Sequence, residues 1–293
     1  MDDRQLHDRP PPPPAPSIDA LLPQDVAQKA DALGATKARL AAPKLVTLAV
    51  LAGAFIALGA VFATVVSSGT DGLPWGVGRL LAGLVFSLGL ILVLVGGAEL
   101  FTGNNLMVMA WASRHISGLE LLRAWALVYL GNMIGGLGTA ALVFLSGHHT
   151  AAGGAVGATA LSIAAAKMAL GPVEAFFLGI LCNVLVCLAV WLCLGARTTA
   201  DRILAIIFPV AAFVAAGFEH SVANMYFIPV ALLIKWFAAD GFWAAAQLAP
   251  VQFAGLTIAG FLHNLVPVTL GNMVGGGGLV GAVYWFVYLR ERR

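Results

Sequence analysis

Two acidic side chains lie inside stretches of sequence that are otherwise apolar, and small polar residues follow each of them. Glu99 occurs in GAELFTGN at 97–104, and Glu219 is followed by His220 in GFEHSVAN at 217–224. A charge at the centre of a membrane span costs at least ~2.5 kcal/mol, so such groups normally line a cavity or pair. Histidine changes its charge near neutral pH, so His220 could donate a proton there. The alternative is a neutral ring that satisfies helix backbone groups.

Other polar side chains could serve the same pathway, and each has a simpler alternative. The two glutamates could relay protons, or they could hold loop backbone by hydrogen bonds. Intramembrane asparagines could cap freed backbone groups or merely pack, and this applies to Asn132, Asn183, Asn224 and Asn272. Lys167 could attract anions, or its side chain could extend to the lipid headgroups.

Composition sets the environment in which this chemistry must work. Of the 293 residues, 60% are hydrophobic and only 10% are charged, whereas soluble proteins contain ~25% charged residues. Most of the surface must therefore face lipid. The net charge of +2 is too small to indicate a nucleic-acid partner. The cysteines have no His or carboxylate close in sequence, so we expect no metal site and no cofactor.

The elements that must position these residues are apolar stretches long enough to cross ~30 Å of hydrocarbon. They are predicted at 45–66, 80–105, 124–146, 172–194, 203–234 and 251–289. The last two are too long for single straight spans. The fifth contains Glu219 and His220, and the sixth contains Pro267 and a glycine run at 275–278. The prediction is an all-α membrane protein with six transmembrane helices.

Lysine and arginine predict the orientation. Only Arg79, Lys167 and Lys235 would lie on one side of the membrane. The other side would hold Lys29, Lys37, Arg39, Lys44, Arg114, Arg123, Arg197, Arg202, Arg290, Arg292 and Arg293. The positive-inside rule places this second side, with both termini, in the cytoplasm. The protein is therefore expected in the cell (inner) membrane.

Three regions are predicted along the chain. Residues 1–22 form a proline-rich tail without an apolar core, which excludes a signal peptide. Residues 23–43 read as an amphipathic helix on the cytoplasmic membrane surface, with Val26, Ala30 and Leu33 on one face, or as a solvated lead-in. Residues 44–290 form the six-helix channel domain.

An internal repeat relates the two halves of this domain. LGNMIGG at 130–136 in the third span recurs as LGNMVGG at 270–276 in the sixth, and the two glutamate segments match in the same order. Three spans per half force the second half to enter the membrane upside down, which predicts inverted repeats with a pathway at their midplane. Irregular backbone is tolerated at that depth only inside protein or around water. We therefore expect helices 2 and 5 to be broken, with their loops meeting in a pore.

These motifs, with LCNVLVCLA at 181–189 and NLVPVTLGN at 264–272, resemble the formate/nitrite transporter family. The resemblance runs from about Pro23 to Arg290. It implies a homopentamer of aquaporin-like protomers, each with its own pore. Glu99 with Gly103 is similar to the nitrite branch, whereas the region around Pro267 is similar to the formate branch.

The resemblance also implies roles for residues. Thr102 corresponds to the threonine of the loop that breaks helix 2, and His220 to the central histidine. Lys167 corresponds to a vestibule lysine, supported by Glu219 and Asn183. Asn224 is expected with them on the substrate pathway. The expected constriction residues are Phe86, Leu90, Leu100, Phe101, Val186 and Phe213, although an isolated Phe or Leu in a span is usually packing.

The expected function is a passive or proton-coupled channel for a small weak-acid anion, most of all formate. Nitrite is the alternative, followed by hydrosulfide and lactate. A bare anion cannot shed its water cheaply in an apolar constriction, whereas its protonated form can. An intramembrane enzyme would need a nucleophile with its base or a metal cluster. The sequence contains neither a Gly-x-Ser-x-Gly nor a His-Glu-x-x-His motif. A scaffold or sensor would not need the polar midplane residues.

Overall fold

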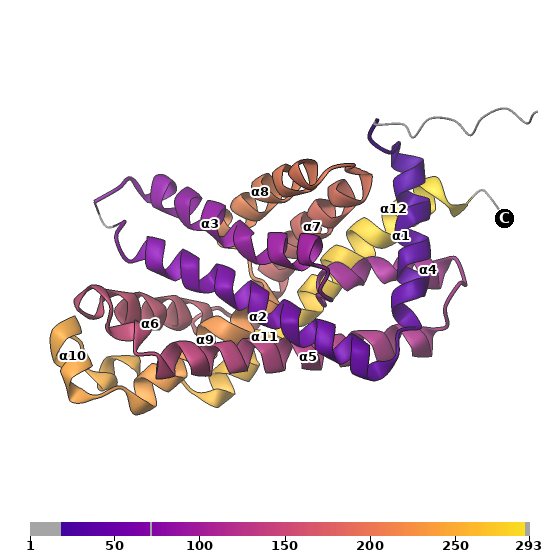
Figure 1. The fold of residues 1–293 in the computed structure, drawn as a ribbon. Coiled ribbons are helices and arrows are strands. Elements are labelled where there is room, and N and C mark those ends of the chain that lie inside the picture. The colour runs from indigo at the N-terminus through magenta and orange to yellow at the C-terminus, as the bar shows by residue number, and fades with distance from the viewer. Residues whose placement is uncertain (1–18, 71, 291–293) are drawn as a thin grey trace, which may run out of the picture.

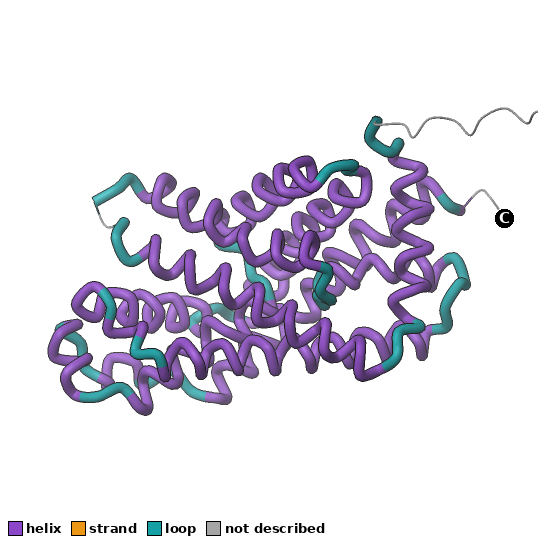
Figure 2. The backbone as a smooth tube through the Cα atoms, in the orientation of Figure 1, coloured by secondary structure: helices purple, strands orange, loops and turns teal. Residues whose placement is uncertain are grey.

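The computed structural model describes residues 19–70 and 72–290, and every regular element in this part is a helix (Figures 1 and 2). Residues 1–18, which make up most of the predicted tail, lie outside the described residues. Within the described ranges, six helices are long and apolar enough to cross a membrane, as predicted. Five are α2 (Ala42–Ser67), α3 (Trp75–Gly96), α5 (Gly118–Leu145), α7 (Pro172–Gly195) and α8 (Thr199–Ala216); the sixth is Pro250–Tyr288.

The sixth span begins with η5 (Pro250–Phe253) and a short turn, and from Ile258 it is a continuous helix whose winding changes. This helix contains α11 (Ile258–Met273), a π-helix at Val274–Ala282 and α12 (Val283–Tyr288). The π-helical part holds the glycine run that the sequence marks as unsuited to a straight α-helix. The remaining elements are shorter: α1 (Pro23–Ala38), η2 (Gly103–Met107), α4 (Val108–Ala112), η3 (His148–Thr150), η4 (Ala152–Gly154), α6 (Ala155–Met168), α9 (Ser221–Phe237) and α10 (Asp240–Ala246).

Two spans begin earlier than their apolar stretches because polar caps extend them. Ser117 precedes α5, and its hydroxyl accepts a hydrogen bond from the Glu120 N–H at 3.2 Å. The Glu120 carboxylate accepts from the Ser117 N–H at 2.7 Å in return. Thr198 and Asp201 form the same box at the start of α8. Such reciprocal bonds satisfy N–H groups that a helix start would leave without partners.

Two helices end in the interior of the protein, at equivalent glycines. After α3, Gly97 has a φ of 83°, and after α8, Gly217 has a φ of 78°. This left-handed conformation favours glycine because it has no Cβ. The chain is then non-helical until Gly103 in the first case and until Ser221 in the second. The stretches 97–102 and 217–220, which we call the first and second loops, approach each other between the helices.

Close packing of helix backbones holds the two loops in position. At Gly135 an added Cβ would collide with the carbonyl oxygen of Val50, which joins α5 to α2. At Gly275 it would collide with the carbonyl oxygen of Ile180, which joins the sixth span to α7. The same type of contact therefore occurs in both halves of the chain.

Helix α1 crosses one end of the bundle, beside α4 and α12, while α6 and α10 lie at the opposite end (Figure 1). Of the apolar face that the sequence predicts, Val26 and Ala30 are buried, whereas Leu33 is 38% exposed. The inward face also includes Asp31 and Gly34, and Gly34 lies close against Ala110 of α4. The inward face is therefore shifted away from Leu33, because the helix packs on protein.

Candidate functional site

The two loops meet at a hydrogen bond between Thr102 and His220. Thr102 Oγ1 lies 3.0 Å from His220 Nε2. Thr102 is fully buried and His220 is 3% exposed. Residues 118 positions apart in the sequence are thus joined at the centre of the protein.

The second nitrogen of His220 caps helix α9. His220 Nδ1 accepts a hydrogen bond from the Ala223 N–H at 3.0 Å. A ring nitrogen that accepts from an N–H carries no proton, so the neutral ring has its proton on Nε2. Nε2–H then donates to Thr102 Oγ1. Both alternatives drawn from the sequence meet here, since the ring satisfies helix backbone and also presents a proton to the midplane.

The first loop is held by Asn132 of α5. Its Oδ1 accepts from the Phe101 N–H at 2.9 Å. Its Nδ2 donates to the carbonyl oxygens of Ala49 at 2.7 Å and Glu99 at 3.0 Å. The Asn132 amide therefore supplies hydrogen-bond partners for backbone groups of the first loop that have none once α3 has ended.

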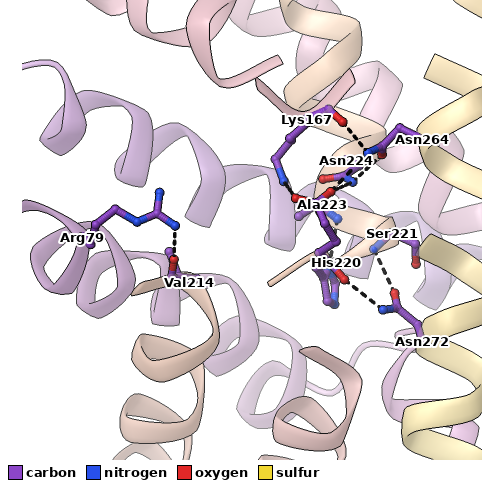
Figure 3. A network of polar contacts seen from close by, with 10 residues as sticks. Arg79, Lys167, Val214, His220, Ser221, Ala223, Asn224, Asn264 and Asn272 are labelled. Carbon is purple, nitrogen blue, oxygen red and sulfur yellow. Dashed lines mark hydrogen bonds and ion pairs between the residues drawn. The ribbon is translucent and has the colours of Figure 1, made fainter. Parts of the chain in front are cut away.

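Asn272 holds the second loop in the same way. Its Oδ1 accepts from the Ser221 N–H at 2.9 Å, and its Nδ2 donates to the carbonyl oxygens of Gly179 at 2.8 Å and Glu219 at 3.0 Å (Figure 3). Each asparagine belongs to the repeated LGNM motif, so the motif performs the same task twice.

Glu219 is ion-paired with Lys167. Lys167 Nζ lies 2.7 Å from Glu219 Oε1 and 5.5 Å from the centre of the Phe227 ring. Glu219 Oε2 accepts from Asn224 Nδ2 at 2.7 Å, and Asn224 Nδ2 also reaches Asn264 Oδ1 at 2.7 Å. The lysine side chain points inward to this carboxylate, which is the opposite direction from one that extends to lipid headgroups.

Glu99 has an equivalent partner that the sequence does not identify. Lys37 of α1 lies with its Nζ 3.0 Å from Glu99 Oε2, and Asn104 Nδ2 donates to the same oxygen at 2.8 Å. Periodicity assigns Lys37 only to the polar side of an amphipathic helix. One signal in the sequence could have matched Lys37 with Lys167. Each lysine lies a few residues before a proline that opens a span, Pro43 for Lys37 and Pro172 for Lys167.

Asn183 connects the two halves from α7. Its Nδ2 lies 3.2 Å from the Thr102 carbonyl oxygen, 2.7 Å from Asn105 Oδ1 and 2.7 Å from the Asn272 carbonyl oxygen. One fully buried side chain therefore contacts the first loop and the anchor of the second loop.

A cavity of about 430 Å³ leads from the α6 end of the bundle to His220. We call it the α6 cavity. Its charged or titratable lining residues are Arg79, Lys167, Glu219 and His220. Apolar side chains complete the wall, including Phe86, Phe213, Phe218 and Phe227.

Aromatic rings close the inner end of this cavity. The Phe86 and Phe213 rings meet edge to face with centroids 5.8 Å apart, and Phe213 stacks on the His220 ring at 5.9 Å. The other expected constriction residues, Leu90, Leu100, Phe101 and Val186, are buried but do not line the α6 cavity. Phe101 packs edge-on against Trp125 and Tyr129 of α5.

Comparison with known proteins gives consistent matches over most of the chain. The family model described as formate/nitrite transporter matches residues 24–286. The formate channel FocA of Escherichia coli (strain K12) is 45% identical over 275 residues, covering 94% of this chain and 96% of that protein. A probable formate transporter of Methanothermobacter thermautotrophicus is 38% identical, covering 92% and 97%.

Solved structures agree with these matches. A pentameric formate channel with formate bound superimposes with a TM-score of 0.81 at 46% identity, covering 85% of this chain and 98% of that one. An FNT family ion channel superimposes with a TM-score of 0.75 at 31% identity, covering 90% and 98%.

Proposed function

Because this chain belongs to the formate/nitrite transporter family, we propose that it is a channel that carries formate across a membrane. The observation that carries the proposal is the buried Thr102–His220 pair at the inner end of the α6 cavity, behind Phe86 and Phe213. Relatives named as formate channels or transporters favour formate over nitrite as the main substrate. Since these relatives are channels and transporters, the protein is not an enzyme.

We infer that the two halves are inverted repeats and that α3 and α8 are the first parts of broken spans. Equivalent glycines end both helices, and equivalent asparagines hold both loops with the same set of bonds. Each loop carries a glutamate that pairs with a lysine from a helix outside the broken span. These matches in glycines, asparagines and ion pairs are expected if both halves of the chain have the same fold.

The protein is proposed to act as a homopentamer in the cell membrane. The solved relative with 46% identity is described as pentameric. Less than half of each apolar span is buried within one chain, which leaves apolar surface for lipid and for neighbouring copies. The distribution of lysine and arginine favours cytoplasmic termini, so the α6 cavity faces outward and α1 covers the cytoplasmic end.

His220 connects the architecture to transport. With no anion beside it, the ring is held neutral because a proton on Nδ1 would break the bond from the Ala223 N–H. A formate anion at the Nε2 side would favour the charged ring by direct attraction. The ring takes its second proton, at Nδ1, from water in the α6 cavity. Nε2 then gives its proton to formate, which leaves a neutral ring protonated at Nδ1 and produces neutral formic acid. Formic acid crosses an apolar constriction more readily than the anion does.

Buried polar atoms without partners support a polar pathway beside this pair. Within the described residues, Asn105 Nδ2, Asn183 Oδ1, Ser221 Oγ and Asn224 Oδ1 are buried and lack a hydrogen-bond partner. A buried group without a partner costs ~1–3 kcal/mol. A water or solute that reached these atoms would remove that cost, so they are the groups of the interior that would bind one.

Transport and assembly can be tested with the purified full-length protein. Reconstituted liposomes should take up labelled formate faster than protein-free liposomes, and faster than they take up nitrite. Mass measurement in detergent should give five chains. A folded pentamer without formate flux would refute the transport proposal, and a clean monomer or trimer would refute the assembly.

A further inference from the structure

We propose that Arg79 supplies the net positive charge of the α6 cavity and is the first binding partner of an entering carboxylate anion. This inference rests on the proposed formate transport. It assigns the capture of the anion to a residue other than the buried lysine.

Arg79 binds the carbonyl end of α8 (Figure 3). Its Nε donates to the Ala215 carbonyl oxygen at 3.1 Å, and its Nη2 donates to the Val214 carbonyl oxygen. The C-terminal end of a helix carries partial negative charge on carbonyl groups without helical partners. These carbonyls lie beside Phe213 and would repel an anion that approaches the constriction. The guanidinium group covers them and reverses the sign of the local charge.

The charges of the cavity lining leave Arg79 without an acidic partner. Among the described residues that line the cavity, the charged or titratable ones are Arg79, Lys167, Glu219 and His220. Lys167 is compensated by Glu219 at 2.7 Å, and His220 is neutral by its bond from the Ala223 N–H. Arg79 binds neutral carbonyls and lies 5.9 Å from the centre of the Trp75 ring, and it feels the charge of Glu219 without forming an ion pair with it. The charges of the lining therefore sum to one positive charge, which remains for an anion.

The guanidinium group also suits a carboxylate in shape. It has five N–H donors in one plane, and a carboxylate can accept two of them side by side. The two bonds to α8 use two of these donors, so Arg79, which lines the cavity, keeps others for an anion. Lys167 has fewer donors free for an anion, because its ammonium group is already in contact with Glu219 and the Phe227 ring.

The two ends of the protein differ in this respect. At the α1 end, Lys37 is compensated by Glu99, as Lys167 is by Glu219. The repeat pairs Gly97 with Gly217, so the position equivalent to Arg79 is Thr199 at the start of α8, which carries no charge. The position equivalent to Arg79 is therefore uncharged, although the α1 end has other cations, such as Lys29, which donates to the Leu194 carbonyl oxygen at 2.8 Å.

The test measures formate uptake into proteoliposomes against formate concentration, at about 10 mM and at about 1 M of an impermeant salt. Arg79→Gln should raise the half-saturating concentration about fivefold or more at low salt, the attraction expected of unit charges ~4 Å apart in water. The difference should shrink clearly at high salt, where the Debye length is ~3 Å. The maximal rate should change less than twofold. Arg79→Lys should restore the part of the affinity that comes from charge, but not the part that comes from two parallel donors.

Two further variants separate charge from structure. Ser162→Asp, at an exposed residue of the cavity lining, leaves Arg79 in place and should raise the half-saturating concentration as Arg79→Gln does, while Ser162→Asn should not. Lys235→Gln removes a lysine that also binds two carbonyls, those of Ala254 and Leu256, but lies outside the cavity. It should leave the half-saturating concentration unchanged.

An effect of Arg79→Gln that is equal at both salt concentrations, or that falls on the maximal rate alone, would overturn the inference and make Arg79 a helix cap. So would an unaltered half-saturating concentration in Ser162→Asp, which decides the matter even if Arg79→Gln fails to fold. Absence of formate flux in the parent protein would instead refute the proposed function.

Discussion

Replacing His220 by asparagine separates the structural task of this residue from its chemical task. The side-chain oxygen of asparagine can accept the Ala223 N–H bond that His220 Nδ1 accepts at 3.0 Å, and asparagine is among the best helix-capping residues. It cannot gain or lose a proton near neutral pH. We therefore expect a folded His220→Asn pentamer whose formate flux depends much less on pH than that of the parent.

The magnitudes support this separation. Loss of the Nε2 bond to Thr102 costs ~1 kcal/mol of folding free energy, and the smaller side chain adds a packing loss of similar size. In the parent, protonating the ring sacrifices the cap bond at ~1 kcal/mol. An anion ~4 Å away returns ~4 kcal/mol at an effective dielectric constant of ~20. Burial of the ring and the charge of nearby Lys167 disfavour the charged ring further, so the ring needs an adjacent anion before it takes up a proton.

The assay is formate flux into proteoliposomes from about pH 5 to 8, with thermal unfolding in detergent to confirm folded protein. His149→Asn is the matched control, because His149 is also a buried histidine but lies in η3, outside the spans. It should retain the pH profile of the parent. A folded His220→Asn protein with that same profile would show that no proton passes through His220.

Four further outcomes are expected. Lys167→Ala should leave its partner carboxylate uncompensated and reduce flux at low formate, and added salt should shrink the deficit; a deficit independent of salt would exclude an electrostatic role. Phe213→Ala should open the aromatic end of the α6 cavity and admit chloride, measured as chloride flux; unchanged selectivity would place the barrier elsewhere. Gly275→Ala should lower stability by ~1–3 kcal/mol through collision with an α7 carbonyl, whereas Gly278→Ala, which meets open space, should not; equal melting temperatures would contradict this. Burial lowers the pKa of His149 below its usual 6.5, so the fold favours the neutral ring. The stability that this provides is present at higher pH and is lost as pH falls through the folded pKa. His149→Asn should weaken this loss of stability at acid pH in thermal unfolding, and identical unfolding curves for the variant and the parent would refute it.

The spans could be read from the sequence because each is a long apolar stretch with few charges. Their starts were less accessible, because α5 and α8 begin at capping residues such as Ser117 and Thr198, outside the apolar window. The meeting of Thr102 and His220 was also predictable, because the repeat pairs the loops that carry them. A repeat states which residues correspond, and in an inverted pair corresponding residues approach one midplane.

Other contacts could not be predicted because they depend on the docking of separate helices. Apolar spacing in α1 correctly places Val26 and Ala30 on the inward face, but it also places Leu33 there, where close approach to α4 leaves room only for a small residue, Gly34. Lys37 reaches Glu99 only through that docking. In the sequence, Arg79 is one of three cations predicted on the same side of the membrane. Its role depends on its contact with the end of α8, and the sequence does not place that helix end beside it.

The position of Asn183 has a consequence for the kinetics of transport. A carrier that alternates between two open states must slide one half of its structure past the other during each cycle. Here a single buried amide contacts Thr102 of one half and Asn272 of the other, so such sliding would break several bonds away from water. We expect the two halves to remain locked while solute passes. The temperature dependence of flux should then resemble that of diffusion through a fixed opening, without the steep rise that a large rearrangement imposes.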